Sequence, residues 1–352
     1  MQEIEQSVSE KLIKWYKLHK RNLPWRNTKD PYKIWLSEII LQQTRVDQGM
    51  NYYLKFVEHY PTVNELSNAK IDEVLRLWQG LGYYSRARNL HATACHIAND
   101  LQGKFPTTYD KIIELKGIGS YTAAAISSFA FSEKKAVLDG NVFRVLSRIF
   151  GIETDIASSK GKKEFQKLAD ELISPTFPGL HNQAIMEFGA LHCTPANPNC
   201  IECPMNNICV AFETKKQKEL PVKIKKLKVK NRFFNYVIFR NEEKIMMKKR
   251  SGKDIWMGLY DFYLFESEEK LLDDKSLITE ISQQKFVIHK MKQYPKKYKH
   301  ILSHQKIHAS FTDIYITKEE FIDGNYTWLN MNEIAEVPKP VLINNFLKEV
   351  YF

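Results

Sequence analysis

Four closely spaced cysteines could bind a metal centre. They follow the spacing C-x6-C-x2-C-x5-C in a proline-containing, loop-like stretch, at Cys193, Cys200, Cys203 and Cys209. Four thiolates can enclose either one Zn²⁺ ion or a cubane iron–sulfur cluster. The intervals differ from the paired short knuckles usual for zinc, so they favour a [4Fe-4S] cluster. Because all four ligands are then protein thiolates and no position stays open, we expect the cluster to fix a loop.

Two carboxylates far apart in the sequence are candidates for acid–base chemistry. Glu38 lies in the apolar run IWLSEIILQQ, where desolvation keeps an acid protonated and suits a general acid. A surface glutamate between apolar neighbours is the alternative. Asp139 precedes a glycine in VLDGNVFRVLSR, where an aspartate commonly serves only as a helix cap. The residues alone leave both alternatives open.

The elements that must position these residues read as helices. Residues 1–213 have the apolar periodicity of successive helices, and Asp30 caps one that opens with Pro31 and carries Glu38. The segment DKIIELKGIGSYTAAAISSFAF predicts a helix, a tight turn with Gly117 and Gly119, and a second helix. Backbone N–H groups at such a turn can hold a phosphate, although an ordinary helix connection is the simpler interpretation.

The composition changes after residue 213. Residues 214–230 are rich in lysine and poor in core residues, which predicts an exposed basic linker. Residues 231–352 contain the strand-like segments FFNYVIF, YDFYLF and HASFTDIYI, a turn at NEEK and a closing helix in VLINNFLKEVYF. This pattern predicts a second, α+β domain.

The charge balance favours a polyanionic partner. The chain has 52 Lys and Arg against 41 Asp and Glu, a formal charge of +11, which suits DNA but also a solvated basic surface. No apolar run is long enough for a bilayer, and the N-terminus lacks the apolar stretch of a signal peptide. We therefore expect no membrane partner and a cytoplasmic location, associated with the nucleoid in a bacterium, where cysteines are read first as metal ligands.

Together these segments resemble the helix–hairpin–helix DNA glycosylases that carry an iron–sulfur cluster, and among them the adenine DNA glycosylase (MutY) family. The matching segments cover the first domain in order: LPWR, SEIILQQTRV, WQGLGYYSRARNLH, LKGIGSYTAAAI, VLDGNVFRVLSR, NQAIMEFGALHCTP and the four cysteines. The second domain is similar, more weakly, to the family's Nudix-like domain. The resemblance implies a mainly α glycosylase domain followed by an α+β domain, a [4Fe-4S] cofactor and a monomer that excises adenine opposite 8-oxoguanine or guanine in duplex DNA.

The resemblance also implies catalytic roles. Glu38 would protonate adenine at N7 and later help to activate water, while Asp139 would stabilise the sugar cation, as in retaining glycosidases. Tyr121 and Asn141 would orient Asp139 and the water. Endonuclease III, the nearest rival, has a catalytic lysine where this chain has Tyr121, and a phenol cannot form the imine needed for strand cleavage. We therefore expect base excision without an efficient lyase; Lys116, before the turn, should not replace that lysine.

Further residues are implied to bind the flipped-out nucleotide and its surroundings. Trp25, Arg26 and Gln183 would line the adenine pocket. DNA contacts are implied for Gln43, Thr44, Tyr83, Gly117 and Gly119, of which Gln43 and Tyr83 would wedge into the base stack. Without the resemblance, a helix-end amide and a core tyrosine are the simpler interpretations of those two.

The implied lesion-reading loop departs from its family at one position. The family's Phe-Ser-His is Leu302-Ser303-His304 here, so Ser303 and His304 match and the packing role of the first residue is in doubt. The carboxylate pattern of a working Nudix hydrolase is missing from GLYDFYLFESEEKLLDD, so nucleotide hydrolysis is not expected. A non-catalytic DNA-binding protein with a redox-sensing cluster is the remaining alternative, but a pure binder needs neither Glu38 nor Asp139.

Overall fold

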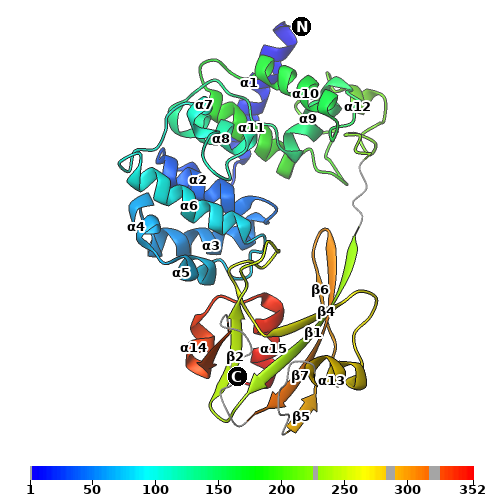
Figure 1. The fold of residues 1–352 in the computed structure, drawn as a ribbon. Coiled ribbons are helices and arrows are strands. Elements are labelled where there is room, and N and C mark those ends of the chain that lie inside the picture. The colour runs from blue at the N-terminus through cyan, green and yellow to red at the C-terminus, as the bar shows by residue number, and fades with distance from the viewer. Residues whose placement is uncertain (1, 225–228, 283–289, 317–325) are drawn as a thin grey trace. The chain divides into compact units, whose positions relative to one another are not determined.

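The computed structural model describes residues 2–224, 229–282, 290–316 and 326–352. The chain forms two compact units, Met1–Ser67 with Ala92–Lys225 and Asn68–His91 with Lys226–Phe352 (Figure 1). Of the expected linker, residues 225–228 lie outside the described residues. The composition did not indicate that residues 68–91 join the second unit. Lys249 pairs there with Asp72 at 2.5 Å, and the Arg88 guanidinium donates to the Met257 carbonyl at 2.7 Å.

The first unit is helical, as its apolar periodicity predicted. Asp30 caps the helix that carries Glu38 by accepting a hydrogen bond from the Tyr32 backbone N–H at 2.9 Å, and Pro31 is its first residue. The helices of this unit are α1 (Gln2–His19), the 3₁₀ turn η1 (Pro24–Arg26), α2 (Pro31–Leu41), α3 (Val46–His59), α4 (Val63–Asn68), α7 (Tyr109–Ile112), α8 (Ser120–Phe131), α9 (Gly140–Phe150), α10 (Ser159–Leu172), α11 (Pro178–Leu191) and α12 (Val210–Glu213). Helix α6 (Ser85–Asn99) begins in the second unit and ends in the first.

The helices that carry the candidate catalytic residues pack closely. Helix α8 is buried along most of its length, and its run of alanines lets it approach α2 and α11. Helix α11 passes the start of α9 so closely that a Cβ on Gly189 would lie 2.6 Å from the Cβ of Asn141. Residues distant in sequence are thereby held beside one another.

The second unit is built on one mixed sheet (Figure 1). Its central strands β1 and β7 run parallel, in a register that pairs Phe234 with Ala309, and the other pairings are antiparallel. The order is β3-β2-β1-β7-β5, with β4 on β1, β6 on β7 and β8 on β2. The expected strands and closing helix are present. The elements are α5 (Ile71–Leu77), β1 (Lys230–Arg240), β2 (Lys244–Lys249), β3 (Tyr260–Asp261), β4 (Tyr263–Ser267), α13 (Asp274–Ser282), β5 (Lys290–Gln293), β6 (Tyr298–Ile301), β7 (Gln305–Tyr315), β8 (Tyr326–Asn330), α14 (Met331–Glu336) and α15 (Val341–Val350).

Aromatic and aliphatic side chains fill the core of this unit. On one face α15 packs on the sheet, where the rings of Phe346 and Phe311 stack 3.9 Å apart. Val237, Phe239 and Trp328 belong to another buried cluster, which also takes in residues of α13. Among the described residues, no helix has the length and apolar character needed to cross a membrane.

Candidate active site

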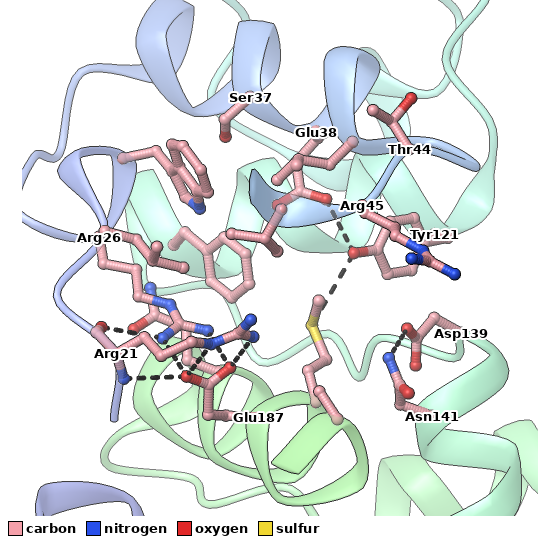
Figure 2. Close-up of a pocket in the computed structure, with 18 of the residues that line it drawn as sticks. Arg21, Arg26, Ser37, Glu38, Thr44, Arg45, Tyr121, Asp139, Asn141 and Glu187 are labelled. Carbon is pink, nitrogen blue, oxygen red and sulfur yellow. Dashed lines mark hydrogen bonds and ion pairs between the residues drawn. The ribbon is translucent and has the colours of Figure 1, made fainter. Parts of the chain in front are cut away.

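One cavity of the first unit gathers side chains from distant stretches of the chain (Figure 2). Its volume of about 470 Å³ falls within the roughly 300–1,000 Å³ typical of small-molecule sites. Glu38 enters from α2, Tyr121 from α8 and Asp139 from the start of α9. The other lining residues are Arg21, Leu23, Trp25, Arg26, Ile34, Ser37, Leu41, Thr44, Arg45, Val46, Phe129, Asn141, Arg144, Gln183, Met186, Glu187, Ala190 and Pro195.

Glu38 is a buried acid, which is the first of the two alternatives that its apolar run left open. It is 6% exposed, and the Tyr121 hydroxyl donates a hydrogen bond to its Oε2 at 2.8 Å (Figure 2). Burial raises the pKa of Glu38 to about 7, although that hydrogen bond acts to lower the pKa. An acid with a pKa near 7 is suited to donate a proton at neutral pH. The resemblance implied that Tyr121 orients Asp139, but its hydroxyl instead contacts Glu38 and, at 3.8 Å, the Met186 sulfur.

Asp139 combines the two roles that the sequence left open. Its carboxylate caps α9, accepting from the Val142 backbone N–H at 2.8 Å and from the Asn141 amide at 2.9 Å, and it also lines the cavity (Figure 2). Burial raises the pKa of Asp139, while these hydrogen bonds favour its charged form. Arg144 holds Asn141 in turn by donating to its Oδ1 at 2.8 Å. Asn141 therefore contacts Asp139 as the resemblance implied, and both catalytic candidates line one cavity.

A third carboxylate at this cavity was missed by the sequence reasoning. Glu187, in α11, is 1% exposed and accepts from Arg21 at 2.6 Å and from Arg26 at 2.7 Å (Figure 2). Burial alone would raise the pKa of Glu187, but the hydrogen bonds from both arginines outweigh burial and lower the pKa to about 2. Its sequence context, NQAIMEFGAL, is as apolar as that of Glu38, so the same signal could have found it.

The residues implied for the adenine pocket lie at this cavity. Trp25 is buried in η1, and the Arg26 guanidinium is fixed by its pairing with Glu187. The Gln183 side-chain oxygen accepts from the Tyr16 hydroxyl at 2.8 Å, which orients the amide. Thr44 also lines the cavity. Polar groups with fixed orientation and an aromatic ring are the features with which proteins hold a planar base.

The two residues implied as wedges share an uncommon backbone conformation. Gln43 has a φ of 55° and Tyr83 a φ of 48°, in the left-handed region that costs most residues about 1–3 kcal/mol. Both side chains are exposed. In the hairpin, Gly117 has a φ of 80°, and a Cβ on Gly119 would meet no atom within 4 Å, so the backbone before α8 is open to a ligand.

The implied reading loop borders a separate cavity within the second unit. This cavity of about 460 Å³ is lined by the turn between β6 and β7 and by residues 80–85. The Leu302 backbone N–H donates to the Gln305 carbonyl at 2.8 Å and closes the turn. The hydroxyls of Ser303 and Tyr83 are hydrogen-bonded, and the His304 ring lies 3.4 Å from the Ser303 hydroxyl. Ser303, His304 and Tyr83 therefore meet at one site, although they are distant in sequence.

The four cysteines lie together in the loop between α11 and α12. All are free and half-buried: Cys193, Cys200, Cys203 and Cys209. The Met205 backbone N–H donates to the Cys203 sulfur at 3.4 Å, and Arg148 donates to the Cys193 sulfur at 3.5 Å. Burial raises the pKa of Cys203 to about 11, and the charges of the other three cysteines add to the rise. Among the described residues, no three His, Cys, Asp or Glu side chains converge closely enough for a single metal ion. Four neighbouring thiols with N–H donors on two sulfurs have the chemistry of an iron–sulfur ligand set.

Family models and relatives agree on the kind of protein. Residues 36–175 match the HhH-GPD superfamily base excision DNA repair protein, and residues 235–349 match the NUDIX domain. The adenine DNA glycosylase of Buchnera aphidicola subsp. Baizongia pistaciae is 35% identical over 341 residues, which is 94% of this chain and 93% of that protein. The adenine DNA glycosylase of Buchnera aphidicola subsp. Acyrthosiphon pisum is 32% identical over 354 residues, which is 97% of this chain and 98% of that protein. Adenine DNA glycosylase of Homo sapiens is 41% identical over 59% of this chain and 40% of its own length.

Solved structures match the first part of the chain. A thermostable thymine-DNA glycosylase superposes with a TM-score of 0.56 at 29% identity, covering 60% of this chain and 97% of its own. A trapped endonuclease III–DNA covalent intermediate superposes with a TM-score of 0.54 at 20% identity, covering 61% of this chain and 99% of its own. This likeness shows a shared fold. The relatives that match along nearly their whole length share both domains with this chain. The chain therefore belongs to the adenine DNA glycosylase family and is a base-excision DNA glycosylase.

Proposed function

We propose that this glycosylase removes adenine paired with 8-oxoguanine or guanine from duplex DNA and leaves an uncut abasic strand. The observation that carries the proposal is that Glu38 and Asp139 line one cavity while burial keeps a proton on Glu38 near neutral pH. The cavity is large enough for a flipped-out base, and its fixed polar groups come from Gln183 and the Arg26–Glu187 pair.

The reaction follows from these two carboxyl groups. Glu38 donates its proton to N7 of the adenine, so the bond between C1′ and N9 breaks and its electron pair leaves with the base. Ionised Asp139 stabilises the sugar cation at C1′ through a transient bond, as in retaining glycosidases. Water then adds at C1′ and displaces Asp139, and its proton passes to Glu38, which restores both groups. Adenine and an abasic sugar are the products.

Strand cleavage is not part of the proposed activity. A lyase needs an amine that can form an imine with the sugar, and Tyr121 offers only a phenol. The hydroxyl of Tyr121 is also committed to Glu38. Lys116 is exposed and is not among the residues lining the cavity.

We assign recognition of the opposite base to the cavity of the second unit. Ser303 and Tyr83 present hydroxyls there that can exchange their mutual hydrogen bond for one to a base edge. Hydrogen bonding of that kind can distinguish 8-oxoguanine from guanine, because the two differ in the groups at N7 and C8. The resemblance of Leu302-Ser303-His304 to the family's reading loop supports this assignment.

We further propose that a [4Fe-4S] cluster is held by Cys193, Cys200, Cys203 and Cys209. When bound, the cluster supplies a covalent tie across the loop that follows α11. Arg144 donates to the Cys193 carbonyl at 2.8 Å and to Asn141 at 2.8 Å, so the chain itself connects this loop to Asp139.

The proposed activity is tested on an end-labelled duplex with one adenine opposite 8-oxoguanine. We expect hot alkali, but not enzyme alone, to cut the adenine strand after incubation with the wild type. Glu38→Gln should bind this duplex yet yield no abasic site, whereas Glu65→Gln, an exposed control, should retain activity. Cutting of a thymine-glycol duplex without alkali would favour an endonuclease III-type lyase. Binding without any abasic product would favour a non-catalytic DNA-binding protein.

A further inference from the structure

Arg148 is a buried cation for which the described residues offer no acidic partner. It lies in α9, is 2% exposed and donates to three backbone carbonyls, those of Leu220 at 3.1 Å, Thr194 at 2.7 Å and Pro195 at 3.0 Å. Among the residues that the structure describes, no carboxylate oxygen lies within 4.0 Å of its guanidinium. Neutral carbonyls satisfy its N–H groups but do not balance its charge, and an unbalanced buried charge is strongly unfavourable.

Among the described residues, Arg148 shares its lack of a carboxylate partner with Arg144, the other buried arginine, which donates to the carbonyls of Gly189 and Cys193. Two half-buried arginines, in contrast, have acidic partners. Arg26 is balanced by Glu187, and Arg250 of the second unit is balanced by Asp254 and Asp261. A guanidinium stays charged at any physiological pH, so it cannot escape the cost by losing a proton. In the part of the chain that the structure describes, no side chain therefore balances the charge at this position.

The cysteine loop is the feature that surrounds Arg148. The Arg148 Nη1 donates to the Cys193 sulfur at 3.5 Å, and the Arg148 backbone carbonyl lies 3.3 Å from the Cys209 sulfur. Arg148 therefore contacts both the first and the last cysteine of the set. Ordinary free thiols are largely neutral at pH 7 and supply little counter-charge. Four thiolates outweigh the positive charge of an oxidised cubane core, so the ligated cluster is an anion.

We propose that Arg148 is the buried counter-cation of the iron–sulfur cluster. The inference rests on the proposed cluster, and it names a residue that helps the protein to keep that cluster bound. The positive charge of Arg148 and its hydrogen bond to the Cys193 sulfur both stabilise a ligated anionic cluster. They also favour reduction of the cluster, because reduction adds a further negative charge. In the cluster-free protein the same charge is uncompensated and destabilises the loop.

Two substitutions separate charge from hydrogen bonding. Arg148→Lys keeps the charge but cannot reproduce the fork of bonds to Leu220, Thr194 and Pro195. Arg148→Gln keeps an N–H donor but removes the charge. Arg250→Gln is the matched control, because it removes a half-buried guanidinium of the second unit, which contains none of the four cysteines.

The readout is cluster retention, not glycosylase activity. The proteins are purified without oxygen, assayed for iron and labile sulfide, and mixed with an iron chelator while the loss of visible cluster absorbance is timed. We expect Arg148→Gln to lose its cluster about 10- to 100-fold faster than the wild type. Arg148→Lys and the control should stay close to the wild-type rate. The midpoint potential, measured by voltammetry, should become more negative in Arg148→Gln and not in Arg148→Lys.

The outcomes distinguish the two levels of the proposal. A lysine variant that loses its cluster far faster than the wild type would overturn the counter-cation role, because hydrogen bonding alone would then account for Arg148. This comparison decides the matter even if Arg148→Gln does not fold. Wild-type retention in Arg148→Gln would overturn the inference but leave the cluster in place. Wild-type protein that contains no iron or sulfide would overturn the cluster itself.

Discussion

The hydrogen bond from Tyr121 to Glu38 should control the pH dependence of excision. The Tyr121 hydroxyl donates to the Glu38 carboxyl at 2.8 Å, in a site where burial raises the pKa of Glu38 to about 7. This bond stabilises the ionised carboxylate and so holds the pKa below the value that burial alone would give. Tyr121→Phe removes the donor and little else of the ring's volume. The pKa of Glu38 should therefore rise.

The size of the shift follows from the energy of one bond to a charged group. Such a bond contributes roughly 1.5–3 kcal/mol, and one pKa unit corresponds to about 1.4 kcal/mol, so the rise should be about 1–2 units. Glu38 is 6% exposed, so solvent screening reduces this only slightly. The protonated acid is the active form. The rate of excision should therefore fall with rising pH through about 7 in the wild type, and about 1–2 pH units higher in Tyr121→Phe.

Single-turnover excision of adenine across a pH series measures this shift. The position of the alkaline limb is compared rather than the maximal rate, because losing the phenol can also slow the chemistry. Tyr32→Phe is the control, since Tyr32 lies on the same helix but its hydroxyl donates to the Tyr60 carbonyl at 2.7 Å. The reasoning is refuted if the limb of Tyr121→Phe coincides with that of the wild type, or if Tyr32→Phe moves it equally.

Three further predictions concern stability, positioning and specificity. Glu38 has its pKa raised from 4.5 to about 7 on folding, so the folded state loses about 3 kcal/mol relative to the unfolded state as pH rises through that window. Glu38→Gln should lack this loss, which urea unfolding at about pH 5 and about pH 8.5 would reveal; equal pH dependence would contradict a buried acid. Gly189→Ala should lower the rate of excision more than the affinity for DNA, because the new Cβ would lie 2.6 Å from the Asn141 Cβ. Single-turnover rates and binding constants test this prediction. An unaffected rate would show that Asn141 can shift freely. Ser303→Ala should reduce the preference for 8-oxoguanine over guanine opposite adenine by about 1–3 kcal/mol in competition assays, and an unchanged preference would remove Ser303 from the reading site.

The features that the sequence determined by itself depend on neighbouring residues. Asp30 before Pro31 starts a helix, because the cap and the preset proline φ act within one turn. The apolar run around Glu38 made a buried acid one of two predictions, and only the tertiary structure decided between it and a surface glutamate. The strand segments and the closing helix of the second unit followed in the same way from local composition.

The partners of the site residues were decided only by tertiary structure. Tyr121 reaches Glu38 across 83 residues of chain, and Glu187 meets Arg21 across 166, so no local pattern relates them. The close approach of Gly189 to Asn141 likewise arises from how α11 crosses α9. Helix packing brings these groups together and desolvates them. Burial and pairing then set opposite pKa shifts on two glutamates with similar sequence surroundings. Burial raises the pKa of Glu38 because it outweighs the Tyr121 hydrogen bond and the charge of Arg26, whereas hydrogen bonds from two arginines lower the pKa of Glu187.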